Sequence, residues 1–120
     1  MSTGSFHKRE RLSRRRSINL VFKKGRRCSS EGISLFVLPN GLGYSRFLCT
    51  FKRGFGNAVK RNRVRRVFKE IYRQNKCCLK GDFDIAFLLS NGFLKMEGSF
   101  EYYVASFFKL LKRGGLVSEL

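Results

Sequence analysis

The sequence predicts a small α+β domain in which helices pack on a mixed sheet, in the order helix, strand, strand, helix, strand, helix. Two segments, residues 57–73 and 100–113, repeat apolar residues at helical spacing, and short apolar segments between turn residues indicate strands. At 120 residues, 42% of them hydrophobic, the chain can form one compact core. We therefore expect a flexible basic arm (1–16), a folded domain (17–113) and a short tail (114–120).

The first elements are marked by turn residues. In the arm, Phe6 and Leu12 are candidate anchors onto the domain. A short helix is predicted to begin near Ser17 and to stop at Gly25, which follows two lysines. Its inward-facing residues are predicted to be Ile18, Val21 and Phe22.

Two strands come next. Residues 33–38 read as a strand that the turn at 39–41 ends, and residues 44–51 read as its antiparallel successor. Phe47, Cys49 and Phe51 would share one face of that second strand because side chains alternate along it.

The helix predicted at residues 57–73 has Asn57 as its N-cap. Its apolar stripe comprises Val64, Val67, Phe68, Ile71 and Tyr72. Residues 83–89 form a continuous apolar strand, expected to be buried on both faces, and the strand, helix, strand order indicates a parallel crossover. The last helix places a core-facing stripe at Phe100, Tyr103, Val104, Phe107, Phe108 and Leu111.

Charge points to a polyanionic partner. The formal net charge is +18, and the basic residues concentrate in residues 1–27 and 52–80. On the helix at 57–73, a ridge of cations at four-residue spacing flanks the apolar stripe, with three polar residues further round. The ridge is Arg61, Arg65, Lys69 and Arg73, and the three residues are Asn62, Arg63 and Arg66. Like charges at this spacing repel, so a bound polyanion explains them better than a solvated face, which would intersperse more acids than Glu70.

We predict no catalytic or metal-binding residues in the chain. The only histidine is His7, in the arm, and the four cysteines lack metal-ligand spacing and are expected to be reduced thiols. Asp82 and Asp84 share a face, but at a strand start they are expected to be solvated. No apolar run could span a membrane or form a signal peptide, so we expect a cytoplasmic protein.

The run from Gly56 to Arg66, Gly-Asn-Ala-Val-Lys-Arg-Asn-Arg-Val-Arg-Arg, resembles the Arg-Asn-Arg signature of the bacterial ribonuclease P protein component. The resemblance extends to Arg11-Leu12 and to residues 21–25, and the element order fits that family over residues 6–113. It implies a left-handed crossover and a role as protein cofactor, monomeric outside the holoenzyme. In that holoenzyme a catalytic RNA with bound Mg²⁺ removes the 5′ leader of precursor tRNA.

The resemblance also implies site residues. Those matching the RNA-subunit contacts are Arg61, Asn62, Arg63 and Arg66. Those matching the leader-binding cleft are Ile18, Phe22, Phe36, Ala58, Arg61, Arg65 and Lys69. Phe22 and Phe36 suit stacking on unpaired bases, although both could equally be core residues. The chain departs from the family pattern at two points: Ile18 stands where the family usually has an aromatic residue, and Gly54 where it usually has a basic one.

Two other classes fit part of the pattern. A stand-alone RNA-binding or ribosomal protein would use the same basic helix without stimulating a catalytic RNA. A membrane-surface protein would use a basic amphipathic helix, but the apolar stripe here is suited to packing on a sheet.

Overall fold

The computed structural model describes residues 8–30, 32–90 and 100–116. Helices predicted at 57–73 and 100–113 and strands at 33–38 and 83–89 are confirmed, with ends that differ by at most two residues. In chain order the elements are the 3₁₀ helix η1 (Lys8–Glu10), α1 (Arg15–Lys24), β1 (Arg26–Ser30), β2 (Ile33–Pro39), β3 (Arg46–Phe51), α2 (Ala58–Asn75), the 3₁₀ helix η2 (Lys76–Cys78), β4 (Phe83–Leu89) and α4 (Phe100–Arg113).

The four strands form one mixed sheet in the order β1-β2-β4-β3. The parallel crossover is confirmed, because β3 and β4 pair in parallel and α2 connects them. The sheet differs from the prediction in two respects, although β3 does run antiparallel to β2. β3 is not the neighbour of β2, since β4 lies between them, and the strand β1 was not predicted at all. β1 is a mostly exposed edge strand whose polar sequence lacks an alternating apolar pattern.

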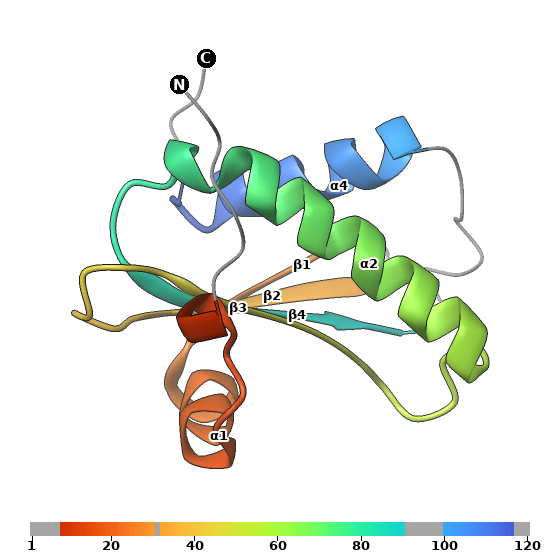
Figure 1. Ribbon diagram of the computed structural model, residues 1–120, viewed down its shortest axis with the longest axis horizontal. Helices are drawn as coiled ribbons and strands as arrows, with labels where there is room; N and C mark the ends of the chain where they lie inside the picture. Colours follow the sequence, from red (N-terminus) through yellow and green to blue (C-terminus); the bar gives the residue numbers. More distant parts are fainter. Residues whose placement is uncertain (1–7, 31, 91–99, 117–120) are drawn as a thin grey trace.

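Helices cover both faces of the sheet. In Figure 1, α2 and α4 lie on one side and α1 projects from the other. Side chains alternate accordingly: Phe47 and Cys49 of β3 join the main core under α2 and α4, whereas Leu48 packs with the smaller cluster beneath α1. The smaller cluster is centred on Leu12, Val21, Phe36 and Ala86.

The long helix α2 has the two faces that its sequence predicts. Four residues of the predicted apolar stripe are buried, namely Val64, Phe68, Ile71 and Tyr72. The Asn57 side chain caps the helix by accepting a hydrogen bond from the Lys60 amide at 2.9 Å. Burial of the stripe turns the cationic residues toward the strand edge or the solvent.

The folded region begins earlier than predicted. Leu12 is completely buried, its amide donates to the Phe47 carbonyl at 2.9 Å, and α1 starts at Arg15. Leu12 is therefore an anchor, as expected, while Phe6 lies outside the described residues. The prediction of a flexible arm up to residue 16 is corrected for residues 8–16, because backbone pairing with the edge strand β3 holds this segment.

The folded region also extends beyond α4. Leu116 is completely buried, and its carbonyl accepts a hydrogen bond from the Lys80 amide at 2.8 Å. The expected tail from residue 114 is thus corrected for residues 114–116, and residues 117–120 lie outside the described part. Burying one leucine is worth about 1.5–3 kcal/mol, enough to hold the chain against the core.

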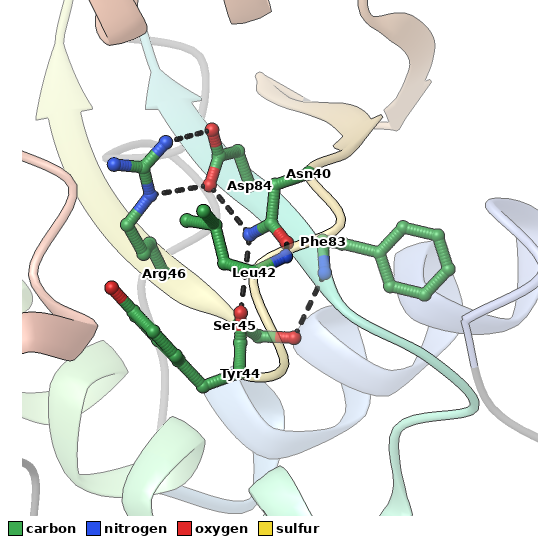
Figure 2. A network of polar contacts seen from close by, with 7 residues as sticks. All are labelled: Asn40, Leu42, Tyr44, Ser45, Arg46, Phe83 and Asp84. Carbon is green, nitrogen blue, oxygen red and sulfur yellow. Dashed lines mark hydrogen bonds and ion pairs between the residues drawn. The ribbon is translucent and has the colours of Figure 1, made fainter.

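A polar network fastens the loop between β2 and β3 to the start of β4 (Figure 2). Arg46 donates through Nε and Nη2 to the two oxygens of Asp84, at 2.7 and 2.6 Å, and Asn40 donates to the same carboxylate at 2.9 Å. The pKa of Arg46 is raised, chiefly by this hydrogen bond. The expectation that Asp84 is solvated was wrong: it is 3% exposed, because the register places it opposite Arg46.

Replacing Gly25 with alanine should destabilise the fold by about 2–3 kcal/mol. A Cβ atom at Gly25 would lie 2.3 Å from the Val21 carbonyl oxygen and 3.1 Å from that of Val37. The backbone at Gly25 has φ −71°, which alanine adopts readily, so the cost comes from this clash. Urea unfolding monitored by circular dichroism measures the effect. A change below about 0.5 kcal/mol would contradict the close approach.

Candidate nucleic-acid interface

A cleft of about 500 Å³ opens at the edge of the sheet formed by β3. One wall is the segment that precedes α1 together with α1 itself, the floor is β3, and the other wall is α2. The lining residues are Arg11, Leu12, Ser13, Ile18, Phe47, Leu48, Cys49, Arg65 and Lys69. The cleft therefore has an apolar floor between two walls that carry cations.

None of these lining residues is acidic. The acids with ion pairs shown among the described residues lie elsewhere: Asp84 binds Arg46, Glu70 binds Arg73, and Glu10 binds Lys76. The Glu70 contacts with Arg73 and Gln74 lower the pKa of that carboxyl to about 2, so it stays ionised at neutral pH. An anion in the cleft would meet arginine and lysine without a neighbouring carboxylate.

Arg65 is held along the strand edge by three contacts. Its Nε donates to the Cys49 carbonyl at 3.4 Å, its Nη1 donates to Asn62 Oδ1 at 3.0 Å, and its guanidinium lies 5.1 Å from the centre of the Phe51 ring. A cation ordered in this way loses less side-chain entropy when it binds a ligand. Arg65 is nevertheless exposed and can meet a phosphate.

The predicted leader-binding residues fall into two groups. Ile18, Arg65 and Lys69 line the cleft together. Ala58 and Arg61 do not: Ala58 is exposed at the start of α2, and Arg61 Nη1 donates to the Phe55 and Gly56 carbonyls at 3.2 and 3.3 Å. Arg61 thus also holds the loop that leads into the helix.

Phe22 of α1 packs against Phe36 of β2, and neither lines the cleft. Their ring centres are 4.7 Å apart with the rings edge to face, and Phe36 is only 9% exposed. The Arg27 guanidinium lies 5.5 Å from the centre of the Phe36 ring. Both rings are part of the smaller core cluster, with Phe22 half-buried at its edge.

The predicted RNA-subunit residues on α2 lie outside the cleft lining. Asn62, Arg63 and Arg66 are exposed, and Arg61 is half-buried. The helix thus presents two cationic surfaces, a cleft-facing one with Arg65 and Lys69 and an outer one with Arg63 and Arg66.

Sequence reasoning missed one wall of the cleft. Arg11 and Ser13 were assigned to a flexible arm, whereas they line the cleft beside the buried Leu12. Two signals were available: that apolar leucine within a basic segment, and the resemblance of Arg11-Leu12 to the family. Leu48 was also missed, because it points away from the main core.

The described residues were compared with the ligand sets of metal sites and with the length of a membrane span. No group of three or more His, Cys, Asp or Glu side chains among them is placed to hold a metal ion. The four cysteines are free thiols. In the same part of the chain, no helix is both long and apolar enough to cross a membrane.

Cys49, on the cleft floor, should resist alkylation. Burial raises its pKa to about 12, so almost none of the reactive thiolate exists at pH 8. Cys77 and Cys78 are exposed and should react first. Iodoacetamide labelling followed by peptide mass spectrometry checks this, with urea-unfolded protein as the control in which all four cysteines react. Labelling of Cys49 as fast as Cys77 in the folded protein would contradict the buried position.

The fold and cleft place the chain among small basic α+β proteins with a cationic groove at a sheet edge. Comparison with known proteins identifies one family within this class. Residues 6–114 match the Ribonuclease P family. The ribonuclease P protein component of Thermotoga maritima is 43% identical over 83 residues, which are 69% of this chain and 71% of the relative. That of Borreliella burgdorferi is 44% identical over 82 residues, 66% of this chain and 69% of the relative.

Solved structures similar to this chain are also ribonuclease P proteins. The Thermotoga maritima ribonuclease P protein superposes with a TM-score of 0.77 at 34% identity, covering 87% of this chain and 96% of that one. The Staphylococcus aureus protein has a TM-score of 0.81 at 18% identity, covering 91% and 98%, and supports the fold alone. The chain belongs to the ribonuclease P protein family, whose members are components of a tRNA-processing ribonucleoprotein nuclease.

Proposed function

We propose that this chain is the protein subunit of ribonuclease P and that it binds two RNA elements at once. The outer surface of α2, with Arg63 and Arg66, contacts the catalytic RNA. The cleft between α2 and the segment before α1 takes the single-stranded 5′ leader of precursor tRNA. The cleft carries the proposal, because it joins an apolar floor to cations in a form suited to unpaired nucleotides.

The chemistry of the cleft supports a sequence-tolerant contact. Arg65 and Lys69 on one wall and Arg11 on the other would neutralise backbone phosphates, which are the same in every leader. Ile18 and Leu48 offer half-buried apolar surface to the bases. An enzyme that processes many precursors needs affinity of this kind, because leader sequences differ.

Bond cleavage is assigned to the RNA subunit in this proposal. In this proposal the RNA would hold Mg²⁺, which would supply activation of water and stabilisation of the leaving oxygen. The protein's part is to bind and orient the precursor. Positioning of this kind can account for a large share of a rate enhancement.

The test is cleavage of a precursor tRNA by a bacterial ribonuclease P RNA at low Mg²⁺, with and without this protein. Stimulation that requires a leader on the precursor would support the proposal. Folded protein that binds RNA without stimulating cleavage would instead support a stand-alone RNA-binding protein.

A further inference from the structure

The segment before α1 is fixed to the domain at three points. Lys76 Nζ donates to both carboxylate oxygens of Glu10, at 2.8 and 2.9 Å. The Arg9 guanidinium lies 4.7 Å from the centre of the Tyr44 ring. The Leu12 amide then pairs with β3, as described above. The partners lie in η2, in the loop between β2 and β3, and in β3, so together they define the position of the segment.

The Glu10–Lys76 ion pair is the one of the three contacts that buries charge. The Glu10 side chain is 8% exposed and that of Lys76 is 19% exposed. Burying a charged pair is a poor way to gain stability, because desolvation offsets most of the attraction. Such a pair does select one geometry, since any displacement leaves a buried charge without its partner.

The geometry that the ion pair selects is the spacing of the two cleft walls. Arg11, Leu12 and Ser13 form one wall and follow Glu10 directly. The opposite wall, with Arg65 and Lys69, belongs to α2, and Lys76 follows the last residue of that helix. The ion pair therefore connects the two walls through residues that do not line the cleft themselves.

We propose that Glu10 and Lys76 are positioning residues that set the spacing of the two cleft walls for single-stranded RNA. This inference rests on the proposed function, because it concerns the same cleft. When the pair is intact, phosphates in the cleft meet Arg11 and Arg65 at a fixed separation. When it is broken, the segment before α1 can move away from β3.

Glu10→Gln tests the proposal, with Glu70→Gln as the matched control. Both variants remove one carboxylate, but Glu70 lies in an exposed i,i+3 pair with Arg73 and does not line the cleft. The readout is the preference of the reconstituted holoenzyme for precursor over mature tRNA, as a ratio of dissociation constants. We expect Glu10→Gln to reduce this ratio about three- to tenfold and Glu70→Gln to leave it unchanged.

A reversed pair separates positioning from general loss of structure. Glu10→Lys combined with Lys76→Glu keeps both charges and should restore the ratio, and it decides the question where Glu10→Gln alone unfolds. Amide hydrogen exchange at Leu12 should be faster in Glu10→Gln and normal in Glu70→Gln. An unchanged ratio in folded Glu10→Gln, or a low ratio in the folded reversed pair, would overturn the inference. A wild-type protein without leader preference would overturn the proposed function instead.

Discussion

Replacing Arg65 with alanine should lower the affinity of the holoenzyme for precursor tRNA about tenfold, or about 1.4 kcal/mol, without changing its affinity for mature tRNA. Arg65 is exposed in the cleft, and its contacts with Cys49, Asn62 and Phe51 hold the guanidinium in place before any ligand arrives. Loss of one phosphate contact should also reduce the slope of log affinity against log salt by about 0.7, the value for a single strand.

Arg63→Ala is the matched control. It removes the same charge from the same helix, but Arg63 is exposed and does not line the cleft. We expect this variant to weaken binding to the catalytic RNA and to keep the preference for precursor tRNA. Titrations of both tRNAs at several salt concentrations separate these effects. Equal losses for precursor and mature tRNA in Arg65→Ala would argue against a leader contact in the cleft.

Local sequence patterns predicted the elements well and their pairing poorly. The apolar stripe of α2 could be read directly, because each helix that packs on a sheet must repeat apolar residues at helical spacing. The insertion of β4 between β2 and β3 could not, because it depends on contacts between distant segments. β1 was not predicted, because it is a strand through its pairing with β2 and its own polar sequence carries no strand pattern.

In the candidate site too, local patterns predicted some residues, and contacts between distant segments were missed. Arg65 and Lys69 follow from helical spacing and from the family signature. The resemblance includes Arg11-Leu12 of the opposite wall but does not place them in the cleft, and a short basic segment looks like a flexible arm. Glu10, which directly precedes this wall, pairs with Lys76 at a separation of 66 residues, and neither residue carries a local signal of the pairing.

Replacing Arg46 with alanine should destabilise the domain by about 3–5 kcal/mol, the largest stability effect we expect from a single substitution. The variant leaves the buried Asp84 carboxylate without its bidentate partner (Figure 2). Asn40 would remain as a hydrogen-bond donor, but a neutral amide does not balance a buried charge. Urea unfolding at neutral pH measures the change in unfolding free energy.

A charge-free pair tests the cause of this loss. Asp84→Leu combined with Arg46→Met removes both charges and keeps apolar volume at both positions, so it should be much more stable than Arg46→Ala. Arg46→Lys keeps the charge but loses the paired geometry, and it should fall between wild type and Arg46→Ala. A loss below about 1 kcal/mol in Arg46→Ala would mean that solvent reaches Asp84 in the variant and replaces the guanidinium. If the carboxylate stays buried, the free energy of unfolding should fall from wild type to Arg46→Lys to Arg46→Ala, because the unpaired charge of Asp84 then determines the loss.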